Sequence, residues 1–331
     1  MKKLNLLLLL LPAVLAVGCS KDDADGSAGS SSSAAVVAAP TEDSAEATMQ
    51  YLMDGMKAGQ PVVVWNSLPE NYQSDINGLV QTFGTNMDPE TWKQSIGLLS
   101  TVHKLLVDKQ DFILNYPALA TSENADAMKK AIPQIAGFLK TIIDGSSDLE
   151  SLKTFDGATF LSTTGANLVS QFDAIVSLVP NPTGAVNGLA AIDSVKIETI
   201  ESTDSTATLK ITGTDSKDDE QKFVKVNGKW LPENMTKDWD KNVQSAREAL
   251  AQMPEKTSEM KMQVMMASGM VGGMLAPLQS AENQEQFNAA LDGLAQSAMG
   301  MMMGGMGGGA PASFGAPAED APSDSGSQFG N

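Results

Sequence analysis

The feature that most constrains the fold is a change in apolar spacing in the middle of the chain. Up to residue 178 the apolar residues recur at helical spacing, whereas between 195 and 211 they fall on alternate positions. The stretch "KFVKVNGKWLPEN" then places Asn227-Gly228 between two strand-like runs, which is the strongest short signal for a β-hairpin. We therefore expect an antiparallel meander of about three strands over 193–232.

Helical spacing occupies the chain on both sides of this meander. Asp88 followed by Pro89 is a favourable helix start, and one long apolar face is expected to follow it, from Trp92 to Ile113. Further helices are expected over 123–143, over 158–178, from Thr236 and over 281–298. The expected fold class is therefore helix-rich α+β, with N-terminal helices, a three-stranded antiparallel meander and C-terminal helices, all within one domain over 41–298.

The end of the meander also has a family resemblance. Its "NGKW" stretch resembles the last strands of small NTF2-like or cystatin-like lipoprotein domains, over about 195–232. The resemblance implies a layer of helices packed against the sheet.

The N-terminus has the parts of an export signal. Lys2 and Lys3 precede an apolar run from Leu4 to Val17, which is shorter than the ~20 residues needed to span a bilayer. The run ends in "LAVGC", residues 15–19, and so resembles the lipobox signal of bacterial lipoproteins. That resemblance implies that residues 1–18 are a lipoprotein signal peptide and that Cys19 becomes an acylated N-terminus. The alternative is an ordinary secretory signal with an incidental cysteine.

The residues after Cys19 predict a tethered location. Residues 19–40 are small and polar, so we expect a flexible Ser/Ala/Asp-rich tether with a reach of ~25 Å. Two or more acyl chains on Cys19 would hold the protein firmly on a bilayer. Ser20, in place of an inner-membrane retention Asp, points by the same resemblance to the outer membrane, facing the periplasm.

Charge excludes some classes of partner. The chain has 22 Lys and Arg against 40 Asp and Glu, for a net charge of −18. Nucleic-acid binding needs clustered basic residues, and adhesion to anionic lipid by charge is equally disfavoured. The lipid on Cys19 is therefore the expected membrane contact. Residues 299–331, rich in Met and Gly and then in acid, are expected to be a disordered tail.

Few residues suggest catalysis. His103 is the only histidine, and it borders the apolar side of its expected helix. Ser258 and Lys261 match the Ser-x-x-Lys element of penicillin-binding proteins, but the companion elements are missing. We read both as helix surface or packing, and expect a protein that is not an enzyme.

Methionine is the unusual component, since more than half of the 19 methionines lie between Met260 and Met306. Four recur at every fourth residue and share one helix face: Met262, Met266, Met270 and Met274. Thioethers are soft ligands that suit Cu(I). The preferred interpretation is that this stripe packs in the core, with a Cu(I)-binding envelope protein as the alternative.

Small residues in the same segment allow a third interpretation. Gly269 and Gly273 lie four apart and would let another helix approach closely. The sequence thus favours a non-enzymatic, lipid-anchored envelope protein that binds a protein partner or an apolar ligand.

Overall fold

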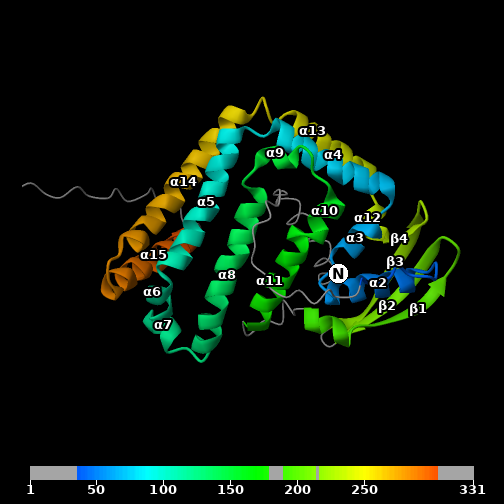
Figure 1. Ribbon diagram of the computed structural model, residues 1–331, viewed down its shortest axis with the longest axis horizontal. Coiled ribbons are helices and arrows are strands. Elements are labelled where there is room, and N and C mark those ends of the chain that lie inside the picture. Colours follow the sequence, from blue (N-terminus) through cyan, green and yellow to red (C-terminus); the bar gives the residue numbers. More distant parts are fainter. Residues whose placement is uncertain (1–35, 179–188, 214–215, 305–331) are drawn as a thin grey trace, which may run out of the picture.

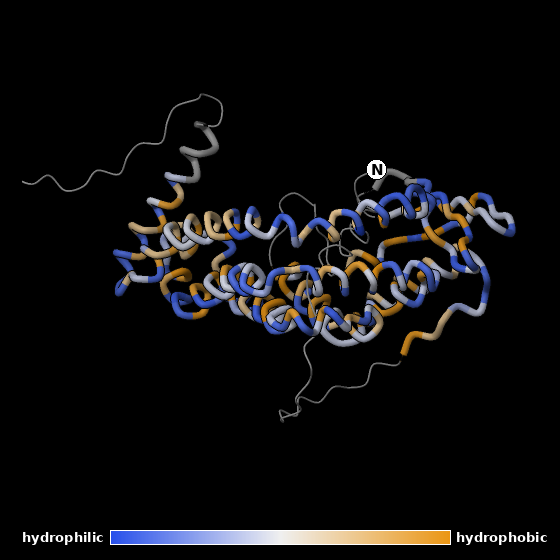
Figure 2. Tube along the Cα trace, turned by 90° about the horizontal axis from the view of Figure 1, so that it is seen from above, coloured by the Kyte–Doolittle hydropathy of each residue, from blue (hydrophilic) through white to orange (hydrophobic). Residues whose placement is uncertain are grey.

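The computed structural model describes residues 36–178, 189–213 and 216–304 (Figure 1). Within them it contains helices before and after one four-stranded antiparallel sheet. The expected fold class, helix-rich α+β, is therefore confirmed. Seen from above, the molecule is long and shallow (Figure 2). The signal peptide, Cys19, the tether up to residue 35 and the tail from residue 305 lie outside the described residues.

Three helices open the described chain where the apolar spacing predicts them: α2 (Ala45–Lys57), α3 (Val62–Asn66) and α4 (Glu70–Asn86). The Ser44 side chain caps α2 by accepting a hydrogen bond from the Ala47 N–H at 3.1 Å. Gly59, at φ +68°, turns the chain after this helix in a conformation that favours glycine.

The long apolar face expected from Trp92 to Ile113 is broken in two. Helix α5 (Pro89–Asp108) begins at the predicted Asp88 cap, but a separate short helix, α6 (Gln110–Leu114), follows it. Lys109 between them leaves helical geometry, with φ −113° and ψ 17°. Its Nζ donates a hydrogen bond to the Ala281 carbonyl at 2.7 Å, so a contact distant in sequence helps to fix the break.

Four long helices form a row. Helix α14 (Thr257–Ser280) packs on α5, α5 packs on α8 (Ala125–Ser146), and α8 packs on α11 (Thr164–Leu178), as Figure 1 shows. Helix α14 is therefore the outermost member of the row. Short helices connect these elements: α7 (Pro117–Ala120), α9 (Leu149–Leu152) and α10 (Gly157–Ser162).

The meander has four strands, so the expected count of three was wrong. The strands are β1 (Lys196–Ser202), β2 (Thr206–Gly213), β3 (Ser216–Val226) and β4 (Lys229–Pro232), paired in chain order, after a 3₁₀ turn over Leu189–Ser194. The Asn-Gly turn is confirmed, with φ 48° at Asn227 and 79° at Gly228. Both arms of the hairpin were expected, so the error lies in the count; the second arm, β4, has only four residues.

Three further helices complete the chain: α12 (Glu233–Thr236), α13 (Trp239–Ala251) and α15 (Gln284–Gly304). Helix α13 lies along α4 (Figure 1). Helix α15 continues to Gly304, past the expected domain end at 298. Met and Ala are good helix formers, so the Met-rich stretch extends the helix despite its glycines.

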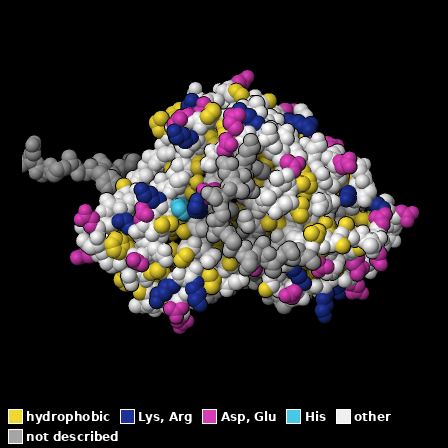
Figure 3. Space-filling view, viewed as in Figure 1, with side chains coloured by type: hydrophobic (Ala, Val, Ile, Leu, Met, Phe, Trp, Pro, Cys, Tyr) yellow, Lys and Arg dark blue, Asp and Glu magenta, His cyan; other side chains and the backbone are white. Residues whose placement is uncertain are grey.

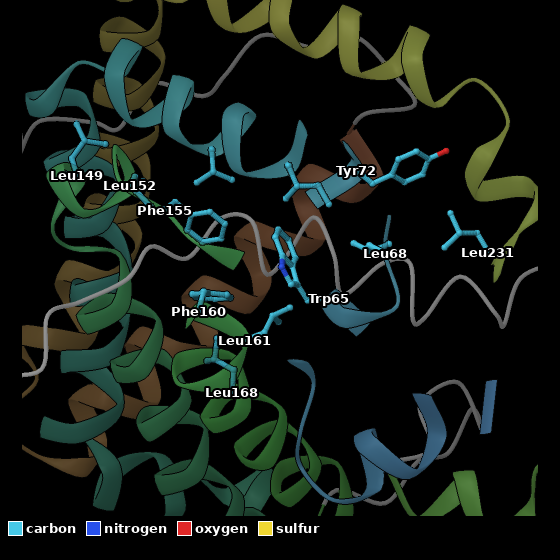
Figure 4. Packing of buried hydrophobic residues seen from close by; sticks show 12 residues of the cluster. Trp65, Leu68, Tyr72, Leu149, Leu152, Phe155, Phe160, Leu161, Leu168 and Leu231 are labelled. Atoms are coloured by element: carbon cyan, nitrogen blue, oxygen red, sulfur yellow. The ribbon is translucent and has the colours of Figure 1, made fainter. Parts of the chain in front are cut away.

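The buried residues form three clusters. The central one joins α3, α4, α9, α10 and β4 around Trp65 and Phe160, and Figure 4 shows these side chains converging. A second cluster packs Ala45 and Met49 of α2 against Leu209 and other sheet residues, so a helix does cover the sheet. The third lies between α5, α14 and α15. Burying a large apolar side chain contributes about 1.5–3 kcal/mol.

Candidate functional site

Helix α14 is held to the molecule by one side only. Leu278 is buried in the third cluster with Leu105 of α5 and Phe287 of α15. Leu275 packs against the same cluster, and Val264, three turns earlier on the same side, is half-buried. The opposite side of α14 faces away from the row of helices.

The outward side forms what we call the methionine face: Met262, Met265, Met266, Gly269, Met270 and Gly273. Its four methionine side chains are 59, 64, 69 and 60% exposed in chain order. The preferred expectation of core packing for this stripe was therefore wrong. The inward side is occupied by Val264, Leu275 and Leu278, which leaves the thioethers on the solvent side. Hydrophobic side chains are visible along the upper left edge of the molecule, over this part of α14 (Figure 3).

The face differs from the stripe that the sequence suggested. Four residues of an α-helix advance about 40° beyond a full turn. Residues spaced four apart therefore drift gradually around the helix instead of staying on one face. Met274 consequently lies at the border of the face and is half-buried. Met265 belongs to the face instead, and the sequence reading missed it. The helical period, applied from Met262 through the third and fourth residues that follow, would have found it.

Gly269 and Gly273 lie in the middle of this face. Both are exposed, and a Cβ atom built at either would meet no atom of the described residues within 4 Å. Neither glycine is therefore required for packing against the part of the chain that the structure describes. Because a glycine costs ~1 kcal/mol relative to alanine in a helix interior, both positions make α14 less stable than alanine would.

The methionine face is uncharged. From Met262 to Ser280 the chain has no acidic or basic residue. The nearest basic group, Lys261 Nζ, is paired with Asp88 Oδ2 at 3.2 Å. Hydrogen bonds from the Thr91 backbone and side chain, together with Lys261, hold the pKa of Asp88 below its usual value. Lys261 is thus engaged by a carboxylate of α5's N-cap, and Ser258 is exposed.

The other candidates for chemistry do not converge. His103 is half-buried on α5. Across 36–178, 189–213 and 216–304, no group of three or more His, Cys, Asp or Glu could hold a metal ion. The methionine face is therefore the feature of the described chain that best suits a function.

A cavity with a mixed polar and apolar lining lies at the other end of the molecule. It has a volume of about 280 Å³ between the N-terminal segment and the β-hairpin. Its lining is as follows: Ala39, Pro40, Thr41, Glu42, Asp43, Thr48, Tyr51, Asn66, Ser67, Gly228, Lys229 and Trp230. Charged side chains such as Glu42 and Lys229 line it beside apolar ones such as Tyr51 and Trp230.

The charged groups beside this cavity are paired with each other. Asp43 accepts hydrogen bonds from Lys225 Nζ and, at 3.0 Å, from Trp230 Nε1. The Lys225 hydrogen bond, then that of Trp230, lowers the pKa of the Asp43 carboxyl. Lys229 Nζ donates to the Asn66 carbonyl at 2.8 Å. The contacts of Asp43 with Lys225 and Trp230, which we call the Asp43 clasp, hold the segment before α2 against the hairpin.

No family model, curated protein or solved structure matches the chain. In the described ranges, none of the helices combines the length and apolar character that crossing a membrane requires. Cys19 lies outside these ranges. The roles of the site residues are therefore inferred from their own geometry and chemistry.

Proposed function

We propose that this chain is a lipid-anchored, non-enzymatic protein of the cell envelope that binds a protein partner through the methionine face. The observation that carries the proposal is the exposure of Met262, Met265, Met266 and Met270 on a helix whose other side is packed. Acylated Cys19 would hold the protein on the outer membrane, facing the periplasm.

Exposed thioethers on a fixed helix suit a binding surface. Fully burying one methionine side chain contributes about 1.5–3 kcal/mol, so a partner that covers four of them gains substantial free energy. Methionine side chains also adapt their shape to the surface that they meet. The open space above Gly269 and Gly273 lets a second helix approach the α14 backbone between the methionines.

The charge distribution selects the kind of partner. The face itself is uncharged, so it fits an uncharged apolar helix on the partner. The whole chain has a net charge of −18, which makes two copies of it repel each other. We therefore propose a different protein, rather than a second copy, as the partner.

Photo-crosslinking in intact cells tests this proposal. A photoreactive residue at position 266 is compared with one at Glu201, an exposed position on β1 at the other end of the molecule. We expect one partner to be crosslinked from position 266 only. The purified partner should then bind the full-length chain, and this binding should be lost in Gly269→Leu.

Gly97→Leu is the matched control for that variant. Gly97 is an exposed helical glycine on α5 with nothing within 4 Å of a Cβ atom. Binding that survives Gly97→Leu and fails in Gly269→Leu supports the methionine face. Equal crosslinking from both positions, or a product made of two copies of this chain, would contradict the proposal.

A second candidate function is Cu(I) binding. Met262, Met265 and Met266 are the three most closely spaced thioethers of the exposed face, and Cu(I) prefers such soft sulfur ligands. Met274, part of the originally expected set, lies off the face. A competition titration under reducing conditions tests the idea. Affinity tighter than micromolar, lost in Met265→Leu, would support it, and weaker affinity would remove it.

A further inference from the structure

The methionines of this chain differ widely in their exposure. On α2, Met49, Met53 and Met56 are 8, 8 and 4% exposed, and they are buried parts of the fold. On α14 the four methionines of the methionine face are 59–69% exposed. An oxidant in solution therefore reaches the thioethers of α14 directly, whereas those of α2 become accessible only when the structure opens.

We propose that the methionine face is an S-oxidation site for peroxides and that its oxidation releases the partner. The release step rests on the proposed function, whereas the oxidation step does not. In the reaction, the thioether sulfur attacks one oxygen of hydrogen peroxide. The O–O bond breaks as the S–O bond forms, the sulfur is oxidised by two electrons to the sulfoxide, and the peroxide is reduced to water.

The chain offers the oxidant no cysteine thiol within the described residues. Its only cysteine is Cys19, which is alkylated in the proposed lipoprotein and then carries no thiol. Within the described residues, methionine thioethers are the oxidisable sulfur groups. The exposed ones in the described part of the chain lie together on one helix face rather than scattered over the surface.

Oxidation should change the face without unfolding the helix. A sulfoxide is polar, so four of them turn an apolar surface into a hydrated one that no longer favours an apolar partner. The inward side of α14 is made of Val264, Leu275 and Leu278, which peroxide does not oxidise. The attachment of α14 to α5 therefore persists. These features make the face a surface that can be switched while the fold stays intact.

Peptide mapping tests the oxidation step. Cleavage after glutamate gives two convenient peptides, 260–282 from α14 and 47–70 from α2. Purified full-length protein is treated with limiting hydrogen peroxide, and fragment spectra place each sulfoxide. We expect Met262, Met265, Met266 and Met270 to be oxidised at least about tenfold faster than Met49, Met53 and Met56. The difference in rate should vanish in urea, where the protein is unfolded. Equal oxidation rates in the folded protein would contradict the proposal that the methionine face is an S-oxidation site.

The partner complex tests the release step. For this test the photoreactive residue replaces Met270 on the methionine face. Peroxide should abolish its crosslink to the partner. With the photoreactive residue at position 270, the variant M262L/M265L/M266L has no methionine left on the face, so it should keep its partner and lose its sensitivity to peroxide. Met266→Gln, which is polar but cannot be oxidised, should weaken binding without peroxide.

The outcomes separate the two proposals. Absence of any specific crosslink in untreated protein overturns both the proposed function and the release step. The relative oxidation rates of the α14 and α2 methionines still test whether the face is an S-oxidation site. A complex that forms but survives full oxidation of the face overturns the release step alone. Restoration of the complex by a methionine sulfoxide reductase would support release by reversible S-oxidation.

Discussion

Gly157 lies against the indole ring of Trp65, so closely that a Cβ atom at position 157 would come within 2.3 Å of Trp65 Cη2. Trp65 is only 6% exposed and belongs to the central cluster, so the ring has little room to move. Any side chain at position 157 must displace this ring or shift α10.

Gly157→Ala should therefore destabilise the protein. We expect the free energy of unfolding to fall by about 1–3 kcal/mol, the usual cost of overpacking a core. Urea denaturation measures the change. Gly97→Ala is the control, since it introduces the same methyl group on α5 into open space and should not lower stability. An equal loss in the two variants would show that the Trp65 contact is not the cause.

Asp75 should be important for holding α13 on α4. Its Oδ1 accepts from Arg247 Nη2 at 2.6 Å and its Oδ2 from Trp239 Nε1 at 3.0 Å. Trp239 also stacks on Tyr72, with ring centroids 3.9 Å apart. Asp75→Ala should lower the free energy of unfolding by about 1–3 kcal/mol, because Trp239 Nε1 loses its partner.

Asp144 provides the comparison for Asp75. It forms an exposed pair with Lys140 on α8, and Asp144→Ala should change stability by less than about 0.5 kcal/mol. Thermal unfolding of both variants under one set of conditions gives the ranking. A larger effect at Asp144 than at Asp75 would contradict the role given to Asp75.

The Asp43 clasp should make stability depend on pH in the acid range. The hydrogen bonds from Lys225 and Trp230 lower the pKa of Asp43 below 3.8 in the folded state. The stabilisation from this shift is present above pH 3.8 and is lost as the pH falls through the lowered folded-state pKa. Asp43→Asn should therefore be less stable than the parent at neutral pH, and the difference should shrink in acid. A difference that is the same at every pH would exclude this linkage.

Gly269→Leu should leave the fold intact. Nothing lies within 4 Å of a Cβ atom at this position, and leucine is a better helix former than glycine. The midpoint of thermal unfolding should stay the same or rise. A clear fall would mean that the methionine face is packed within the chain, which would remove the basis for a partner surface.

Cys19→Ala should release the protein from the membrane fraction. The variant lacks the sulfur on which the proposed acyl group would sit, and the acidic domain has no attraction to anionic lipid. Immunoblotting of soluble and membrane fractions measures the distribution, with Ser32→Ala in the expected tether as the control. A Cys19→Ala protein that still sediments with membranes would contradict the lipid anchor.

Local signals in the sequence predicted local structure well. Asp88 before Pro89 marked the start of α5, and Asn227-Gly228 marked the hairpin, because a cap or a tight turn depends on neighbouring residues. The break after α5 was missed because it involves Lys109 and the distant Ala281 carbonyl. Tertiary contacts of this kind leave no local pattern.

The candidate site was predicted in part. The sequence singled out Met262, Met266, Met270, Gly269 and Gly273, and the fold brings them onto one exposed face. The preferred burial of the methionines was wrong, because spacing shows that residues share a side of a helix but not whether that side faces the core. Whether that side faces the core depends on where α14 lies, which is at the end of the row of helices.

The two edges of the sheet differ in how they resist added strands. On β1, Lys196, Glu198 and Glu201 are exposed, and the pairing with β2 is irregular between Thr199 and Glu201. Charges and irregularities of this kind discourage an edge from aligning with a strand of another molecule. The opposite edge, β4, has four residues and ends in Pro232, which has no N–H to donate. A high local density of this protein should therefore not lead to aggregation through its sheet.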